Sequence, residues 1–213
     1  EREQSAQRER AGLIARLAGL EESLLHRDGG EAILSGRSGA VIRGRLSSLI
    51  TVESGWETAV GAALGPLADS IVVADLRSAV SALTLLKSES AGQSELLVVD
   101  SNDSALTVTL PAGFSSLASL IRTDGLDSAL SHLLARYVAV RDLDEAQSLL
   151  THDSTLIAVT IDGDLVSRNR VKGGSAGGNS AIEINALIER TRESLYEKSA
   201  ICEKLSFELA RLK

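Results

Sequence analysis

Helical heptads stand at both ends of the chain, and a different pattern lies between them. The positions of the stripe follow one another at alternating spacings of four and three: Ala6, Arg10, Leu13, Leu17, Leu20 and Leu24 at the N-terminal end, and Ile184, Ile188, Thr191, Leu195, Lys198, Cys202, Leu205, Leu209 and Leu212 at the C-terminal end. Such spacing keeps one stripe facing a partner helix, as in a coiled coil. A coil that stops at a folded block and then resumes predicts a chain that runs out, turns around and comes back.

The block between the heptads is expected to fold around an aliphatic core. The 213 residues are 44% hydrophobic but only 2% aromatic, so Leu, Val, Ile and Ala must supply the buried surface. We expect no membrane span and no signal peptide, because no apolar run is long enough and the first turns are charged. The chain starts with Glu rather than Met, which predicts a piece of a longer protein. A single cysteine, Cys202, excludes an internal disulfide and fits a reducing cytoplasm.

Two segments of the middle block resemble each other. Residues 49–60 are echoed by residues 120–130, with one residue fewer before the glycine, and residues 71–76 are echoed by residues 138–143. Each copy predicts short strands and a helix, at a separation of about 70 residues. The echo favours two similar subdomains in one insert. A chance resemblance between two strand–helix units is the alternative.

The clearest strands come last. Residues 155–161 are rich in β-forming residues, Asp162-Gly163 predicts a type I′ hairpin turn, and residues 164–166 lead back. The Asp162-Gly163-Asp164 run lacks the other acidic positions of a calcium loop, so we favour a turn over a metal site. A glycine-rich segment, residues 173–178, follows before the second helix begins.

No arrangement of residues predicts catalysis. The three histidines, His26, His132 and His152, have no neighbours that indicate a triad or a zinc site, and we expect His132 to be partly buried. Asp75 and Asp142 both follow short apolar strands, as ribose-binding acids do. Without a glycine-rich turn after a first strand, helix capping is the favoured role for both. We therefore expect no catalytic residue, metal or cofactor within these residues, and core packing for Cys202.

Three motifs make the chain similar to a known family. They are Gly44-Arg45-Leu46-Ser47-Ser48-Leu49-Ile50-Thr51-Val52 with Trp56-Glu57-Thr58-Ala59-Val60; Ile71-Val72-Val73-Ala74-Asp75 with Ala79 and Ala82-Leu83; and Val159-Thr160-Ile161-Asp162-Gly163-Asp164-Leu165-Val166-Ser167 with Gly173-Gly174-Ser175. On these motifs, residues 39–178 resemble the hinge domain of bacterial structural maintenance of chromosomes (SMC) proteins. The chain departs from the family pattern at Arg170, where a glycine is usual, and at Lys172, where a small or β-branched residue is usual.

The resemblance implies a fold class and a domain order. The class is α+β, with two similar α/β subdomains forming an SMC-type hinge, flanked by N- and C-terminal coiled-coil helices that pair antiparallel. The implied domains are an N-terminal arm at 1–35, hinge subdomain I at 36–118, hinge subdomain II at 119–180 and a C-terminal arm at 181–213.

The resemblance also implies a function. In this family the hinge joins two long chains at the end farthest from their ATPase heads, and subdomain one of each chain pairs with subdomain two of the other. We therefore expect a homodimer of a cytoplasmic, nucleoid-associated protein of chromosome condensation and segregation. ATP and Mg²⁺ are expected at head domains that these residues do not include.

The glycine-rich segment allows three interpretations. It is a flexible linker, a phosphate cradle, or a surface where missing side chains let two backbones approach. The cradle lacks the Gly-Lys-Ser/Thr ending of a P-loop. In the third interpretation an exposed strand at residues 165–171 pairs with the sheet edge of another subunit. The family resemblance favours this last interpretation, with Gly173, Gly174, Gly177, Gly178, Val171 and Leu165 as the dimer interface.

Basic residues gather at three places. Arg168, Arg170 and Lys172 lie beside the glycines, Arg190 and Arg192 near the start of the second helix, and Arg43 and Arg45 at the start of the insert. The formal net charge of −7 argues against a chain coated in nucleic acid, although phosphate contacts need only a local cluster. We expect these residues to bind DNA without sequence specificity, as hinges of this family commonly do. A solvated charged surface is the alternative, since Glu183, Glu189 and Glu193 lie nearby.

Two other functions stay open. A small α/β nucleotide-binding domain predicts that a mononucleotide or dinucleotide stabilises the fold. A nucleic-acid-binding module whose dimerisation is incidental predicts tight binding of single-stranded DNA by monomers.

Overall fold

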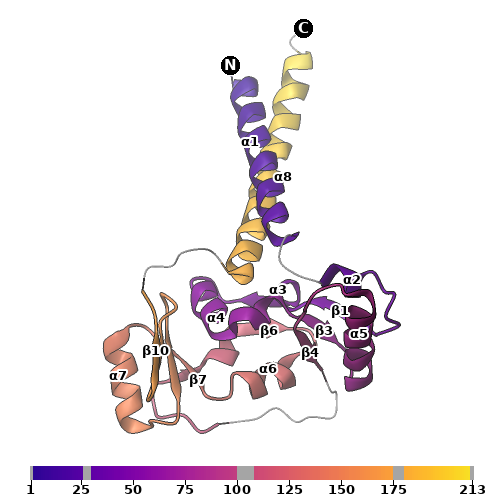
Figure 1. The fold of residues 1–213 in the computed structure, drawn as a ribbon. Coiled ribbons are helices and arrows are strands. Elements are labelled where there is room, and N and C mark those ends of the chain that lie inside the picture. Colours follow the sequence, from indigo (N-terminus) through magenta and orange to yellow (C-terminus); the bar gives the residue numbers. More distant parts are fainter. Residues whose placement is uncertain (1, 26–29, 100–107, 175–179, 212–213) are drawn as a thin grey trace. The chain divides into compact units, whose positions relative to one another are not determined.

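The computed structural model describes residues 2–25, 30–99, 108–174 and 180–211 (Figure 1). It divides into two units. The helical pair comprises residues 1–27 and 184–213, and the insert comprises residues 28–183. Within the described residues no helix is both long and apolar enough to cross a bilayer.

The helical pair follows most of the predicted heptad stripe. It consists of α1 (Arg2–Leu25) and α8 (Ala181–Arg211), whose first turn belongs to the insert. Ile188, Thr191 and Cys202 of α8 are buried at the predicted spacing, which agrees with the packing role expected of Cys202. Ala6 of α1 is buried as well. Arg10 is the exception, because its side chain is exposed.

Ion pairs join α1 to α8. Glu21 contacts Arg192 at 2.8 Å, and Glu9 contacts Lys198 at 2.6 Å. Glu9 precedes Glu21 in α1, whereas its partner Lys198 follows Arg192 in α8. This reversed order is expected of antiparallel helices. The side chains of Leu24, Leu209 and Leu212 lie outside the described residues.

The insert contains two similar series of elements, after a short helix α2 (Gly30–Leu34). The first copy consists of β1 (Ile42–Arg45), α3 (Leu46–Leu49), β2 (Ile50–Val52), α4 (Glu57–Leu64), the 3₁₀ helix η1 (Gly65–Asp69), β3 (Ile71–Val73), α5 (Leu76–Glu89) and β4 (Leu96–Val98). The second consists of β5 (Ser115–Ser116), the 3₁₀ helix η2 (Leu117–Leu120), β6 (Ile121–Thr123), α6 (Asp127–Leu133), β7 (Tyr137–Val140), α7 (Leu143–His152) and β8 (Ile157–Thr160). Two more strands, β9 (Leu165–Ser167) and β10 (Arg170–Lys172), follow the second copy.

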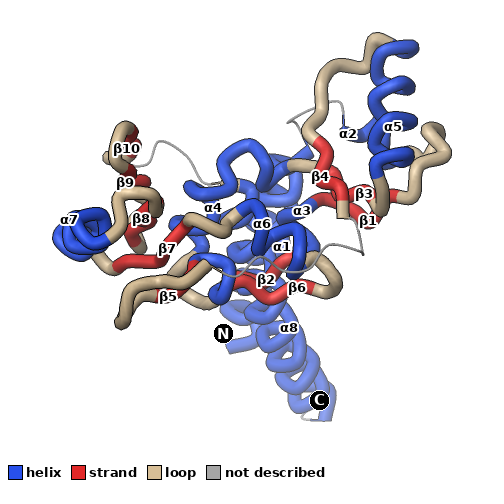
Figure 2. Tube along the Cα trace, turned by 90° about the horizontal axis from the view of Figure 1, so that it is seen from below, coloured by secondary structure: helices blue, strands red, loops and turns tan. Residues whose placement is uncertain are grey.

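Strand pairing confirms the repeat. In the first sheet β1 is antiparallel to β3, and β3 is parallel to β4. In the second sheet β5 is antiparallel to β7, and β7 is parallel to β8. Strands β2 and β6, one from each copy, form a separate antiparallel ribbon in which Thr51 faces Arg122. This ribbon lies between the two larger sheets (Figure 2).

The two copies share their largest apolar core. Leu46 of the first copy and Leu130 of the second both belong to it, and each is at most 2% exposed. Smaller clusters lie beneath α5, around Ala82, and beneath α7, around Leu149. Truncating a fully buried Leu to Ala costs about 2–5 kcal/mol. Because the shared core draws on both copies, we expect them to unfold together.

The two aspartates after the apolar strands are helix caps, as predicted. Asp75 accepts a hydrogen bond from the Ser78 amide at 2.6 Å, and Asp142 accepts one from the Glu145 amide at 2.8 Å. The Ser78 amide also lowers the pKa of Asp75 below its ordinary value, because it stabilises the charged carboxylate. Each carboxylate therefore satisfies an amide at the start of its helix.

Candidate dimer-contact site

The turn between β8 and β9 is a hairpin, but its type differs from the prediction. A type I′ turn would need a positive φ at Asp162, yet Ser90 is the only non-glycine with positive φ among the described residues. The β-turn instead closes from the Gly163 amide to the Thr160 carbonyl at 2.9 Å, and Gly163 follows it with φ +88°. The glycine also lets the turn approach α4, because a Cβ there would lie 3.0 Å from Cγ2 of Thr58.

The strand expected at residues 165–171 is a second hairpin. Strand β9 pairs with β10 in antiparallel register, with Val166 opposite Val171. The physical reason for the difference is the turn at Arg168 and Asn169, which reverses the chain. Leu165 is half-buried and packs against the shared core, whereas Val171 is 71% exposed. Of the predicted interface residues, Val171 therefore lies on the outer strand and Leu165 lies on an inner one.

Within the described residues, β4 and β1 are the edges of the first sheet, and β10 and β5 are the edges of the second. Strand β4 pairs with β3, and β10 pairs with β9, and each stands last in its sheet. The two copies differ at this position. Strand β8 of the second copy corresponds to β4 of the first, but β8 pairs with β9 on the side that is the sheet edge in β4. An unpaired edge presents backbone amides and carbonyls that can pair with another strand.

The two described glycines after β10 have different reasons to be glycine. A Cβ on Gly173 would overlap Oδ1 of Asp164 and lie 2.8 Å from its Cγ. Gly174 has open space around it but a φ of +115°, which L-residues rarely adopt. Gly177 and Gly178, the other predicted interface glycines, lie outside the described residues.

Asp164 connects the glycines to the inner sheet. Its Oδ1 accepts a hydrogen bond from the Gly174 amide at 3.1 Å, and its Oδ2 accepts one from the Thr160 hydroxyl at 3.1 Å. The Thr160 oxygen in turn accepts from the Asp164 amide at 2.9 Å. Thr160 is 1% exposed, so the anchor of this network is buried. No sequence pattern singles out Asp164 beyond its place in the turn.

The start of α8 is held by a capping box, which was not among the predicted features. The Glu183 amide donates to Oγ of Ser180 at 3.3 Å, and the Ser180 amide donates to Oε2 of Glu183 at 2.6 Å. The Thr58 hydroxyl of α4 donates to the other Glu183 oxygen at 2.6 Å. The Ser-x-x-Glu spacing at residues 180–183 is the signal that could have found this cap.

The structure brings some of the predicted basic residues together. Arg168, Arg170 and Lys172 are all exposed on or beside the β9–β10 hairpin. Arg43 and Arg45 lie on β1 of the other sheet, where Arg43 donates to the Gly125 carbonyl and Arg45 to the Asp69 carbonyl, both at 3.2 Å.

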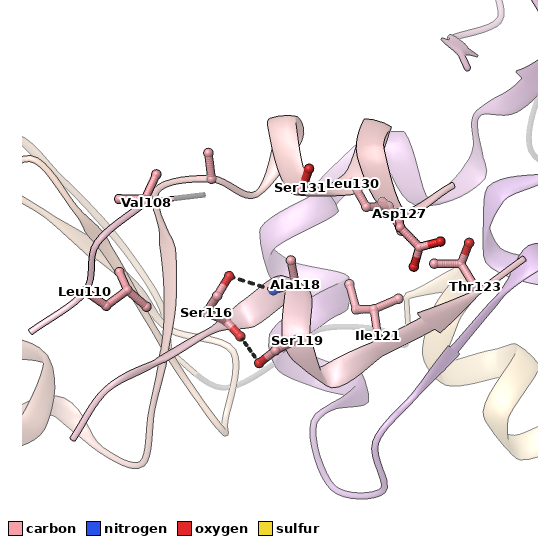
Figure 3. A pocket seen from close by; sticks show the side chains of 11 residues that line it. Val108, Leu110, Ser116, Ala118, Ser119, Ile121, Thr123, Asp127, Leu130 and Ser131 are labelled. Carbon is pink, nitrogen blue, oxygen red and sulfur yellow. Dashed lines mark hydrogen bonds between the residues drawn. The ribbon is translucent and has the colours of Figure 1, made fainter. Parts of the chain in front are cut away.

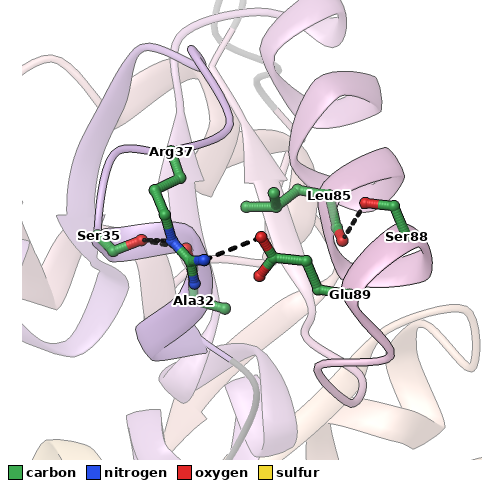
Figure 4. A network of polar contacts seen from close by, with 6 residues as sticks. All are labelled: Ala32, Ser35, Arg37, Leu85, Ser88 and Glu89. Carbon is green, nitrogen blue, oxygen red and sulfur yellow. Dashed lines mark hydrogen bonds and ion pairs between the residues drawn. The ribbon is translucent and has the colours of Figure 1, made fainter.

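Arg192 and Arg37 have acidic partners. Arg192, in the helical pair with Arg190, contacts Glu21 and Glu189 at 2.8 and 2.7 Å. The hydrogen bond to Glu21 raises the pKa of the Arg192 guanidinium above its ordinary value. Arg37, next to the insert's first turn, is paired with Glu89 of α5 at 2.9 Å (Figure 4). The cluster at residues 168–172 is therefore the best candidate for phosphate contact.

A cavity of about 330 Å³ lies between η2, β6 and α6 (Figure 3). Ile121 and Leu130 line it together with Asp127 and several hydroxyls, and no Lys or Arg is among its lining residues. The hydroxyls of Ser116 and Ser119 already bond to the local backbone. Among the described residues, the lining therefore offers no side-chain cation to a nucleotide phosphate.

The part of the chain that the structure describes holds neither a cluster of three possible metal ligands nor a buried histidine. The expectation of a partly buried His132 is wrong, because its side chain is exposed on α6. His152 is exposed too, with Nδ1 at 2.9 Å from the Ser148 carbonyl, and His26 lies outside the described residues.

A duplicated α/β insert carried between two helices defines the class of protein to which this chain belongs. The chain belongs to the family of SMC flexible hinge domains, since the model of that family, "SMC proteins Flexible Hinge Domain", matches residues 39–150, more than half of the 213 residues.

Relatives and solved structures agree with this assignment. The chromosome partition protein Smc of Mycobacterium tuberculosis is 36% identical over 214 residues, which cover 98% of this chain and 18% of that protein. The chain thus spans less than a fifth of that relative's length. The Geobacillus stearothermophilus SMC hinge domain, solved as an asymmetric dimer, has a TM-score of 0.79 at 27% identity, covering 98% of this chain and 91% of that one. The Pyrococcus furiosus SMC hinge domain has a TM-score of 0.59 at 28% identity, covering 82% and 92%.

Proposed function

We propose that this chain is a homodimerisation module that joins two coiled-coil arms. The observation that carries the proposal is that β4 of the first copy and β10 of the second each end a sheet, paired on one side only among the described strands. If β10 of one chain pairs with β4 of another, a two-fold axis creates the same contact a second time. Each subunit then offers both halves of the interface, and the dimer closes on itself.

The details of the hairpin support this pairing. Val171 is largely exposed in the middle of β10, and Gly173 and Gly174 follow without side chains that would hold a second backbone away. In the duplicated fold, β9 covers β8 in the place that corresponds to the open side of β4. A strand from a partner would complete the first sheet in the way that β9 completes the second. The Geobacillus stearothermophilus hinge domain, solved as an asymmetric dimer, supports dimerisation as such.

Sedimentation or light scattering tests the proposal. We expect a mass of two chains at micromolar concentration, and a strict monomer would overturn the proposal. Val171→Asp should weaken the dimer, because it places a charge in the middle of the pairing strand. Val80→Asp is the matched control, since Val80 is also an exposed valine, 55% accessible on α5. A dimer equally tolerant of both substitutions would exclude β10 as the contact strand.

The parent protein is proposed to act in chromosome partition. The Mycobacterium tuberculosis relative is a chromosome partition protein Smc, and this chain matches 18% of its length. We place ATP and Mg²⁺ binding in head domains beyond these residues, and the protein in the cytoplasm at the nucleoid. In this arrangement the insert is not an enzyme but the joint between two arms.

DNA contact is the second part of the proposal. The three cations at residues 168–172 are exposed on one hairpin, which is the local cluster that phosphate binding requires. Such contacts bind the backbone without reading base sequence. Arg43, Arg45, Arg190 and Arg192 are secondary candidates, because several of them already bond to carbonyls or carboxylates.

A further inference from the structure

Asp164 connects two parts of the chain that are ten residues apart, the turn after β8 and the glycines after β10. One carboxylate oxygen accepts from the Gly174 amide, and the other accepts from the buried Thr160 hydroxyl. The backbone of the same two residues is also paired, because the Thr160 amide donates to the Asp164 carbonyl at 2.9 Å. The carboxylate is therefore held from the sheet side and presents one oxygen to the glycine segment.

Gly173 is shaped around this carboxylate. Any side chain at position 173 would occupy the space of Oδ1 and Cγ of Asp164. The glycine thus makes room for a group of its own chain, in addition to leaving the outer surface bare. A bulky substitution of Gly173 would displace Asp164 and so disturb the segment even where no partner touches that residue.

The segment that Asp164 holds is the end of the edge strand. Strand β10 has only three residues, all exposed, and it pairs with β9 alone among the described strands. An exposed three-residue strand gains little from packing, and ordering a free backbone costs roughly 1–2 kcal/mol per residue. A hydrogen bond just beyond the last residue of β10 already restricts the backbone in the monomer. Less conformational entropy is then lost when the dimer forms.

We propose that Asp164 is a positioning residue of the dimer contact: it fixes Gly173 and Gly174 so that β10 is already in the conformation that a partner's strand requires. The inference rests on the proposed homodimer and names the residue that prepares its contact surface. The inference gives the two glycines different roles. Gly173 leaves room for the Asp164 carboxylate, and Gly174 adopts the positive φ of the backbone turn.

Three substitutions test this role. Asp164→Ala removes both acceptors, whereas Asp164→Asn keeps one oxygen for the Gly174 amide. Asp162→Ala is the matched control, because Asp162 is an exposed aspartate of the same turn. The readouts are hydrogen exchange at the Gly174 amide by NMR and the dimer Kd by analytical ultracentrifugation. For Asp164→Ala we expect roughly tenfold faster exchange and a roughly tenfold higher Kd, the effect of losing one charge-assisted hydrogen bond. Asp164→Asn should lie between, and Asp162→Ala should match the wild type.

Each outcome decides the matter. Unchanged Gly174 exchange in Asp164→Ala overturns the proposal, and so does faster exchange with an unchanged Kd. If Asp164→Ala does not fold, the two readouts are taken on Asp164→Asn, which keeps the side-chain volume. A monomeric wild type would remove the homodimer and this inference with it. A dimeric wild type with an Asp164→Ala variant of equal affinity would remove this inference alone.

Discussion

Gly61 of α4 lies directly against Ser180, the residue that caps α8. A methyl group on Gly61 would overlap Oγ of Ser180 and lie 2.9 Å from its Cβ. Gly61 is buried and sits inside a helix, where glycine is otherwise unfavourable by roughly 0.5–1 kcal/mol relative to alanine. Its presence therefore follows from the close approach of the cap rather than from helix formation.

Gly61→Ala should destabilise the insert despite its better helix propensity. The added methyl group displaces the Ser180 cap, and overpacking of this kind costs about 1–3 kcal/mol. The free energy of unfolding, measured in urea, reports the change. Gly12→Ala in α1 is the control, because a Cβ there has nothing within 4 Å and should leave stability equal or higher. Equal stability of Gly61→Ala and wild type would mean that Ser180 moves away without cost.

Thr58→Val should loosen the start of α8. The substitution keeps the shape of the side chain but removes the hydroxyl that donates to Glu183 at 2.6 Å. The loss of one half-buried hydrogen bond costs about 1 kcal/mol. Amide exchange in the first turn of α8 should become faster, while exchange in α7 should not change. Thr84→Val is the control, since its exposed hydroxyl bonds to the Val80 carbonyl of its own helix. A first turn whose exchange is unaffected would show that the Ser180 and Glu183 box suffices.

Local patterns allowed much of the fold to be predicted. The heptad stripe identified both helices, and the echo between residues 71–76 and 138–143 identified two copies with the same strand and helix. Asp75 and Asp142 were predictable as caps because the interaction lies within three residues of the chain. Such short-range chemistry is encoded where it acts.

Contacts between distant residues could not be predicted in the same way. The pairing of β2 with β6 joins residues about 70 positions apart, and neither strand shows which partner it will choose. The hairpin at Arg168 and Asn169 lacks the glycine that usually marks a tight turn, so residues 165–171 resembled one strand. The reason for Gly173 depends on Asp164, whose position beside it exists only after β8, β9 and β10 have paired.

The helical pair should lose stability as the solution is acidified. The hydrogen bond from Lys198 lowers the pKa of Glu9 below its ordinary value. A carboxylate with a lowered pKa contributes stability that is fully present above the pKa that it has in the unfolded chain. That stability is lost as the pH falls through the pKa that it has in the folded protein. Glu9 in turn raises the pKa of Lys198. The stability that Lys198 contributes is therefore complete below the pKa that it has in the unfolded chain, and it is lost as the pH rises through the pKa that it has in the folded protein.

Glu9→Gln isolates this effect. Thermal unfolding of the wild type and the variant should differ near neutral pH and converge at acidic pH, where Glu9 is protonated in both states. Both side chains are about half exposed, so the difference should be small and should shrink at high salt. A difference that persists at low pH would mean that the substitution acts through packing rather than charge.

The cluster of Arg168, Arg170 and Lys172 should control the salt dependence of DNA binding. Each phosphate contact contributes about 0.9 to the slope of log K against log salt for duplex DNA and about 0.7 for single strands. Replacing all three by Ala should therefore lower the slope by about 2–3 and weaken binding equally for unrelated sequences. The matched control replaces Arg77, Lys87 and Arg122, three exposed cations elsewhere on the insert, and changes the net charge by the same amount. Both triple variants are compared at concentrations where they have the same mass in solution, because the first set lies on the proposed contact strand. An equal loss of slope in the two variants would show that net charge, rather than this hairpin, attracts the DNA.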